Sequence, residues 1–243
     1  MPFTLSHPAL ILPLNYLPKK WISLTGLAIG SLTPDFEYFL RMKIESNFSH
    51  TLWGILWFDL PLGILLTFIY HNIVKNEFIK NLPKELNSRL LNFKKLKWNN
   101  YFAENWKIVT LSLFIGILSH IFWDSFTHES GFFVKVFSEL QNTIEIFGKP
   151  IKILKLLQHS STIIGGILII YTIYKLPKSE YIKNEINPKY WINVILITFI
   201  IFAMKFSISE NPIKIGNIIV SLISAGIIGL IFTPYVMKRK NRT

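Results

Sequence analysis

The stretch KIVTLSLFIGILSHIFWDSFTHESG, residues 107–131, decides the fold of this chain. Residues 107–126 form a mainly apolar run, long enough to cross a bilayer as an α-helix. The run ends in His120, Asp124 and His128, which are spaced by four residues. On a helix this spacing keeps all three side chains on one face and puts the two imidazoles about 12 Å apart. The stretch therefore predicts a membrane helix that carries a polar cluster at one end.

Two interpretations of this cluster are open. Metal–nitrogen bonds are only ~2 Å long, so we do not expect both histidines to bind one ion. A carboxylate between them could instead bridge two ions about 4 Å apart. In the structural interpretation, the same side chains only cap the helix end or bind water.

The composition indicates a membrane protein without thiol chemistry. The 243 residues are 51% hydrophobic, with a net charge of +12 and no cysteine, and the mean hydropathy is +0.39. The basic residues lie between apolar runs, as the positive-inside rule describes, so we expect no nucleic-acid partner. Without cysteine, any metal must be held by histidine and carboxylate, which favours zinc, manganese or iron.

The apolar runs predict an all-α, polytopic membrane bundle. Five segments are long enough to span a bilayer: about 51–71, 107–126, 160–176, 190–208 and 215–236. Residues 8–18 and 21–34 are apolar but short and interrupted by prolines, so we expect a re-entrant or interfacial helix pair there.

Positive charge sets the expected orientation. The connections 72–106 and 177–189 and the C-terminal tail are basic, which predicts that they are cytoplasmic. Residues 127–159 and the link at 209–214 would then lie outside. We expect a helical core at 1–176 with a basic, amphipathic insertion at 72–106, followed by two spans and a basic tail at 177–243.

This topology brings ionisable residues to one membrane face. His50, His120, His128 and His159 would meet there with Asp124, and Asp35 would join them if the N-terminal pair emerges on that side. Ionisable groups at membrane depth are costly and usually functional, so a shared site is favoured. Glu37, two residues after Asp35, could face the same cavity as a base.

Four motifs carry a family resemblance: MPFTLSHPA (1–9), IGSLTPDFEYFL (29–40), FSHTLWGILWFDLPLG (48–63) and SHIFWDSFTHESG (119–131). Across roughly residues 1–170 the chain resembles the bacterial membrane family catalogued as domain of unknown function 4184. It is more distantly similar to membrane-bound metal-dependent hydrolases and to zinc-dependent phospholipase C. The resemblance implies a core like the phospholipase helical fold and a place in the bacterial inner membrane. The topology predicted above puts the metal site at the extracytoplasmic face.

The resemblance also implies a ligand set. One ion would be held by Asp35, His50, His120 and Asp124, a second by His128 and His159, and a third by His7, with Asp124 as a bridge. Asp35 would also be the general base. Ile163 stands where the phospholipase has a glutamate ligand, so the second ion would need Glu129 or Glu145 as a further ligand. The phospholipase uses its N-terminal residue in the third site, whereas His7 stands further along this sequence, so we predict two ions, most simply zinc.

These observations predict a membrane-embedded, metal-dependent hydrolase of a phosphoester, in which the substrate is a lipid or lipid-linked and membrane lipids are the partners. The alternative is a non-enzymatic membrane protein with a structural metal site, such as an assembly or lipid-binding factor.

Overall fold

The computed structural model describes residues 3–179, 186–208 and 214–240. The chain divides into two compact units. Unit 1 comprises residues 1–35, 48–64 and 105–173, and unit 2 comprises residues 36–47, 65–104 and 174–243. Most of the predicted link at 209–214 and part of the connection 177–189 lie outside the described residues, and so does the end of the tail.

Short helices and a hairpin make up unit 1 outside its long helices. They are η1 (Thr4–Ser6), α1 (Pro8–Ile11), η2 (Leu12–Tyr16), α2 (Leu24–Gly30), η3 (Thr33–Asp35), α4 (Leu52–Gly54), η4 (Ile55–Asp59), α9 (Phe132–Val136), η7 (Ser138–Gln141), β1 (Thr143–Ile146) and β2 (Lys149–Lys152).

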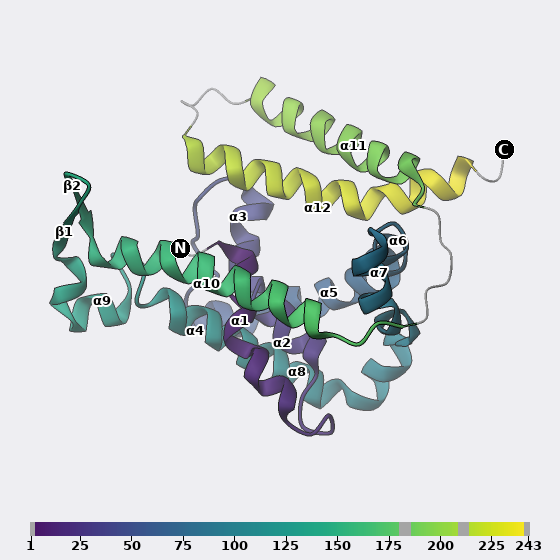
Figure 1. Cartoon of the computed structure of the whole chain (residues 1–243), viewed down its shortest axis with the longest axis horizontal. Helices are drawn as coiled ribbons and strands as arrows, with labels where there is room; N and C mark the ends of the chain where they lie inside the picture. The colour runs from purple at the N-terminus through teal and green to yellow at the C-terminus, as the bar shows by residue number, and fades with distance from the viewer. Residues whose placement is uncertain (1–2, 180–185, 209–213, 241–243) are drawn as a thin grey trace. The chain divides into compact units, whose positions relative to one another are not determined.

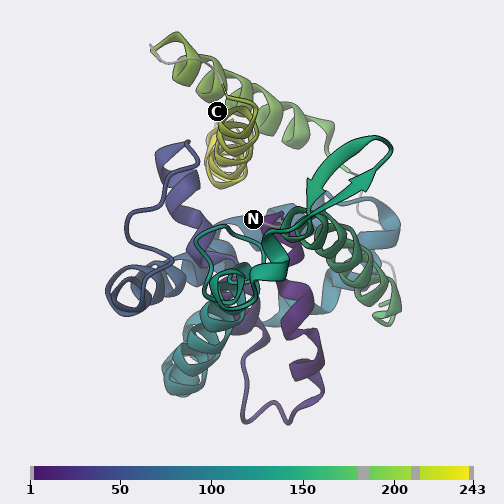
Figure 2. The same cartoon turned by 90° about the vertical axis from the view of Figure 1, so that its left-hand side faces the viewer.

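Unit 2 contains α3 (Phe36–Arg41), η5 (Tyr70–Val74), α6 (Lys75–Lys80), α7 (Lys84–Leu90), η6 (Leu91–Lys95), α11 (Pro188–Ser207) and α12 (Ile215–Lys240). Three helices contribute to both units: α5 (Leu60–Ile69), α8 (Trp98–Asp124) and α10 (Ile153–Lys175). In unit 2, α11 and α12 lie side by side along their length (Figures 1 and 2).

Five helices of the described residues are long and apolar enough to cross a membrane, which confirms the predicted number of spans. They are Leu52–Lys80, Trp98–Asp124, Ile153–Lys175, Pro188–Ser207 and Ile215–Lys238. The N-terminal helices α1, η2 and α2 have at most seven residues each. Prolines lie at the start of α1 and within η2, as the sequence predicts, whereas α2 contains none and ends at Gly30.

The first two spans extend further than predicted. The helical segment from Leu52 continues to Lys80, and α8 already begins at Trp98, so both enter the expected insertion at 72–106. Within α8 the backbone is kinked at Asn105 (φ −125°, ψ 21°), close to the predicted start of the second span at residue 107. Contacts in unit 2 explain the extension: the His71 and Trp98 rings stack 4.3 Å apart, and Lys75 Nζ donates to the Leu96 carbonyl at 2.8 Å. Only α7 and η6 separate the two helices.

A small hairpin is the exception to the all-α prediction. Strands β1 and β2 pair antiparallel, with Ile146 opposite Lys149, and the hairpin precedes α10 (Figure 2). Phe147 and Gly148 at its tip both have positive φ, 51° and 73°. A two-residue turn with this backbone matches the twist of paired strands.

Close packing of α2 on α8 organises unit 1. A Cβ added at Gly30 would lie 2.2 Å from the Leu113 carbonyl oxygen, and one at Gly116 would lie 2.4 Å from that of Leu27. The backbones therefore touch, because only glycine leaves room for that approach. The chain leaving α2, through Ser31 to Asp35, is thereby placed beside the end of α8.

Candidate metal centre

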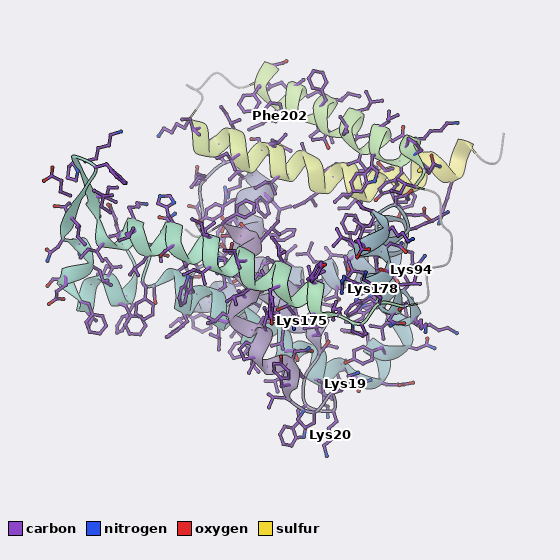
Figure 3. The ribbon with its side chains drawn as sticks, in the orientation of Figure 1. Lys19, Lys20, Lys94, Lys175, Lys178 and Phe202 are labelled. Atoms are coloured by element: carbon purple, nitrogen blue, oxygen red, sulfur yellow. The ribbon has the colours of Figure 1, made fainter. Side chains whose placement is uncertain are left out.

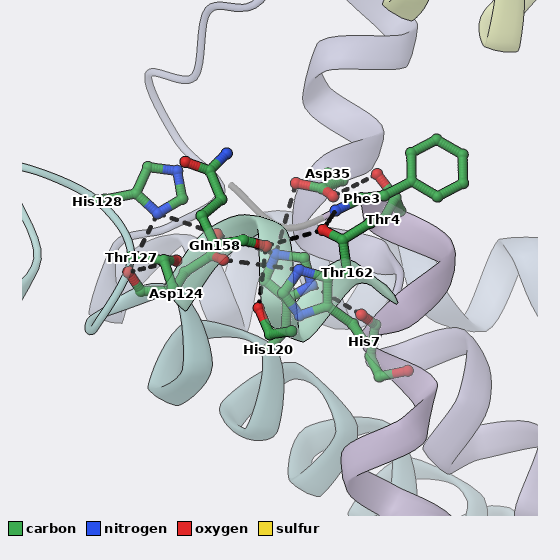
Figure 4. Close-up of polar contacts among 12 residues, drawn as sticks. Phe3, Thr4, His7, Asp35, His120, Asp124, Thr127, His128, Gln158 and Thr162 are labelled. Atoms are coloured by element: carbon green, nitrogen blue, oxygen red, sulfur yellow. Dashed lines mark hydrogen bonds and ion pairs between the residues drawn. The ribbon is translucent and has the colours of Figure 1, made fainter. Parts of the chain in front are cut away.

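Four side chains converge at the end of α8. His120 lies one turn before the helix end and Asp124 is its last residue, whereas Asp35 ends η3 and His50 precedes α4. One ligand atom from each of the four lies within 4.8 Å of all the others. Figure 4 shows Asp35, His120 and Asp124 meeting there. These four residues are called the metal cluster below.

The spacing of the atoms suits a single ion. His120 Nε2 lies 3.4 Å from Asp124 Oδ2 and 3.5 Å from Asp35 Oδ1, and His50 Nε2 lies 3.5 Å from Asp124 Oδ2. Ligand atoms bound at ~2.0–2.2 Å to one tetrahedral ion are about 3.3–3.6 Å apart. His50 Nε2 and Asp35 Oδ1 are slightly further apart, at 3.9 Å, so a small movement of these side chains would let the four residues hold one metal ion.

Buried polar atoms in the cluster lack hydrogen-bond partners. His120 and Asp35 are fully buried, and Asp124 is 4% exposed. Within the described residues, His120 Nε2, Asp35 Oδ1 and both carboxylate oxygens of Asp124 have no hydrogen bond. Buried polar atoms are nearly always satisfied in folded proteins. Coordination of a cation would satisfy all of these atoms together.

Neighbouring groups orient the ligands. His120 Nδ1 lies 2.7 Å from the Ser31 carbonyl oxygen. That oxygen can only accept, so Nδ1 carries a proton, and Nε2 would offer a lone pair to a metal ion once it has lost its own proton. Thr4 Oγ1 donates to Asp35 Oδ2 at 2.5 Å, which leaves Oδ1 facing the two histidines. Ligand-supporting contacts of this kind are typical of metal sites.

His7 faces the second oxygen of Asp124. Its ring stacks on that of His120 with centroids 3.7 Å apart, and its Nε2 lies 3.6 Å from Asp124 Oδ1 (Figure 4). Both ring nitrogens are buried without a hydrogen bond in the described part of the chain. Burial, aided by the charge of His120, lowers the pKa of His7 to about 3. A neutral imidazole retains a lone pair for a metal ion.

Charge also acts on Asp35, which lies outside the membrane-spanning segments. Burial raises the pKa of this carboxyl group, but the charge of the His120 ring, 3.5 Å away, lowers it, and the net pKa is below its usual value. Asp35 is therefore a carboxylate at neutral pH, the form that binds a cation.

His128 lies nearer to His120 than the helical spacing predicts. Its Nδ1 is 3.5 Å from Asp124 Oδ2, the oxygen that His120 also faces. The expected 12 Å separation is wrong because α8 ends at Asp124. Beyond it the chain turns, and the His128 ring approaches the Asp124 backbone carbonyl at 3.1 Å. The central position of Asp124 is as predicted.

His159 and Glu37 lie apart from this group. His159 is exposed on the second turn of α10 and does not belong to the metal cluster found among the described residues. Glu37 belongs to unit 2, where its carboxylate accepts from Arg41 Nε at 2.9 Å, Ser46 Oγ at 3.1 Å and Asn47 N at 2.8 Å. These contacts hold residues 42–47 against α3.

Two supporting groups were not anticipated from the sequence. The Ser31 carbonyl has no side-chain signal, because any residue there offers the same oxygen. Thr4 lies in the opening motif, but nothing in its spacing connects it with Asp35, 31 residues later.

The fold and the cluster define a multi-pass helical membrane protein with a histidine–carboxylate site that could hold a metal ion. The chain belongs to the family described as "Domain of unknown function (DUF4184)", whose model matches residues 1–235. No curated protein and no solved structure gives a significant match. The likeness to the phospholipase fold therefore stays a prediction.

Proposed function

We propose that this protein is a membrane-embedded hydrolase that uses divalent metal to cleave a phosphoester. One observation carries the proposal: the cluster has the spacing of a single-ion site, and further donors lie directly beside it. His7 and Asp124 Oδ1 are buried and lack hydrogen-bond partners in the described chain. A closed structural site would be complete with four ligands. The additional donors favour a larger, reactive centre.

The donor set suits zinc, with manganese or iron as alternatives, because it offers nitrogen and carboxylate oxygen without thiolate. We propose two ions. Asp35, His50, His120 and Asp124 would hold the first, and Asp124 would share the second with His7. His128 and His159, expected from the family resemblance, remain candidates to complete it. Ions bound in this way supply Lewis acidity and lower the pKa of water toward neutrality.

The protein's own groups would orient the metal ligands and deprotonate the attacking water. The Ser31 carbonyl fixes the tautomer of His120. The sequence predicts that either Asp35 or Glu37 is the general base, the group that accepts the proton. Glu37 is engaged by Arg41, Ser46 and Asn47, so we propose Asp35 as the general base. Water would reach the centre past His50 and His128, whose side chains are 22% and 29% exposed, since those of Asp35 and His120 are fully buried.

Metal analysis of detergent-purified protein tests the proposal. We expect one to two equivalents of zinc or manganese in the wild type. His120→Ala should lose the first ion, and Asp124→Ala should lose both, because Asp124 faces both positions. Ser119→Ala is the control, since its hydroxyl donates to the Gly116 carbonyl of its own helix. A metal-free wild type, or unchanged metal content in His120→Ala, contradicts the proposal.

Activity separates the enzyme from the structural alternative. The metal-loaded protein should hydrolyse a soluble phosphodiester such as bis(p-nitrophenyl) phosphate, and Asp35→Asn should abolish this hydrolysis. A protein that binds metal stoichiometrically and loses thermal stability on chelation, yet hydrolyses no phosphoester, would instead have a structural site.

We further propose that the protein lies in the bacterial inner membrane with the metal centre at the extracytoplasmic face. The positive-inside rule supports this orientation, because the basic connections lie at the opposite ends of the first two spans from His50 and Asp124.

A further inference from the structure

An apolar groove lies beside the metal cluster, separated from Asp124 by the His7 side chain. It has a volume of about 300 Å³ and lies within unit 1, between the N-terminal segment, the end of α8 and helix α10. Its main walls are His7, Leu10, Trp123, Leu157, Ile164 and Leu168. A volume of this size lies at the lower end of the range for small-molecule sites.

His7 belongs both to this groove and to the surroundings of the metal cluster. It lines the groove, and its Nε2 lies 3.6 Å from Asp124 Oδ1. Trp123, which directly precedes Asp124, also lines the groove. A molecule in the groove would therefore end within reach of the metal centre.

The residues that α10 contributes to the groove change from polar to apolar along the helix. The groove-lining residues of α10 lie at 157, 160, 161, 164, 165 and 168, a spacing that places them on one helical face. Ser160 and Ser161 are polar, whereas Ile164 and Leu168 are apolar. From Ser160 to Leu168 the helix rises about 12 Å. This stripe suits a molecule with a polar head and an extended hydrocarbon tail.

The outer surface of α10 indicates where such a molecule comes from. Helix α10 is one of the five candidate membrane spans, and little of its apolar window is buried within the protein. Ile164 and Leu168 are 57% and 45% exposed. In a bilayer these side chains meet lipid, so the groove opens onto hydrocarbon.

We propose that this groove binds the hydrocarbon chain of a membrane lipid and presents its phosphoester headgroup to the metal centre. The inference rests on the proposed function and adds to it the class of substrate, a lipid phosphoester taken directly from the bilayer. The chain would lie along α10 between Leu10 and Leu168, and the headgroup would lie beyond His7.

Photolabelling tests occupancy without depending on hydrolysis. The probe is phosphatidylglycerol with a diazirine on one acyl chain, in vesicles containing the purified protein. We expect crosslinks in the peptides that carry residues 6–10 and 157–168, and excess unlabelled phosphatidylglycerol should suppress them. Bulk lipid around the spans also labels, but an equal excess of competitor reduces that labelling only by dilution. Labelling of the groove peptides no more saturable than that of α11 would overturn the inference.

Matched variants test where the hydrocarbon chain of the lipid binds. Ile164→Trp should fill the groove and lower its labelling about tenfold, whereas Ile163→Trp, one residue away and 62% exposed, does not line the groove and should leave labelling unchanged. Leu168→Trp and Ile167→Trp form a second such pair. Equal labelling in the members of both pairs would contradict the proposed position.

Metal content and activity distinguish the two proposals. If Ile164→Trp retains metal and still hydrolyses the soluble phosphodiester but loses hydrolysis of the long-chain lipid, both proposals hold. If it hydrolyses both substrates as the wild type does, only the groove inference fails. If the wild type holds no metal, the proposed function fails, and the photolabelling result still decides whether the groove binds lipid.

Discussion

Asp124 derives its proposed role from the two oxygens of one carboxylate. Oδ2 faces His50, His120 and His128 at 3.4–3.5 Å, and Oδ1 faces His7 at 3.6 Å. An asparagine there would offer only one oxygen and no charge. The residue is therefore suited to join two ions, which explains why one substitution is expected to remove both.

Thr4 offers a test of the groups behind the ligands. Thr4→Val keeps the shape of the side chain but removes the donor to Asp35 Oδ2. Loss of such a supporting contact typically lowers metal affinity about 10- to 100-fold. Thr172→Val is the control, because the Thr172 hydroxyl is exposed and donates to the Leu168 carbonyl of its own helix. A competition titration with a zinc-binding dye measures both affinities; equal values for the two variants would refute a supporting role for Thr4.

Several residues of the site could be predicted from the sequence, because ionisable residues are unusual in apolar segments. His120 and Asp124 were predictable from one helical run, and His50 from its place at the start of another. Asp35 came with the family resemblance. The Ser31 carbonyl and the stacking of His7 on His120 could not be foreseen, because both depend on how closely α2 and the N-terminal segment approach α8.

At the scale of elements, the contact between α2 and α8 is the structural support of the metal centre. It brings Ser31 to His120, because Gly30 and Gly116 let the two backbones touch. The hydrogen bond from Ser23 N to Ser112 Oγ, 2.8 Å long, joins the same two segments near the start of α2. Both glycines lie in apolar runs, where a sequence pattern cannot distinguish a close crossing from ordinary membrane packing.

Gly116→Ala should therefore damage both stability and metal binding. The added methyl would lie 2.4 Å from the Leu27 carbonyl oxygen, so α2 must move away from α8. Overpacking of this kind typically costs about 1–3 kcal/mol. We expect a lower melting temperature in detergent and weaker zinc binding. Gly166→Ala on α10 is the control, since a methyl there meets no atom within 4 Å.

If Gly116→Ala does not accumulate, Gly26→Ala tests the same crossing from the side of α2. Its methyl would lie 2.7 Å from the Val109 carbonyl oxygen and 2.8 Å from the Ser112 Cβ atom of α8. A Gly116→Ala protein as stable as Gly166→Ala, with the same metal affinity, would show that the crossing does not support the site.

The lengths of the first two spans show where pattern reasoning loses precision. Hydropathy located both segments, but it ended the first near residue 71 and began the second near 107, whereas the helices extend to Lys80 and from Trp98. The charged and aromatic residues of 72–106 predict an insertion on the membrane surface. Their partners, such as Trp98 for His71 and the Leu96 carbonyl for Lys75, are tertiary contacts that composition does not encode.

At the scale of the whole molecule, contacts within unit 2 group the connections between spans. Lys178, after the third span, pairs with Glu85 of α7 at 2.8 Å, and Ser179 N donates to the Ser88 carbonyl at 2.9 Å. Arg89 donates to the carbonyls of Tyr174 and Leu176. The two basic connections are thus joined by contacts of Lys178 and Ser179 with α7; Figure 3 labels Lys94 and Lys178, one in each connection. Five alternating spans require this arrangement.

The orientation of the chain in the membrane can be tested directly, because the sequence contains no cysteine and the wild type gives no background with thiol reagents. Lys95→Cys and Lys178→Cys place a thiol in the two basic connections, and Phe147→Cys places one at the fully exposed hairpin tip between the second and third spans. The positive-inside rule predicts that a membrane-impermeant maleimide labels only Phe147→Cys in intact cells, and all three after permeabilisation.

Labelling of the two lysine positions alone would place the metal centre at the cytoplasmic face and reverse the proposed side of substrate entry. Different results for Lys95→Cys and Lys178→Cys would contradict the five-span topology itself, because both connections must lie on one side if the second and third spans cross the bilayer.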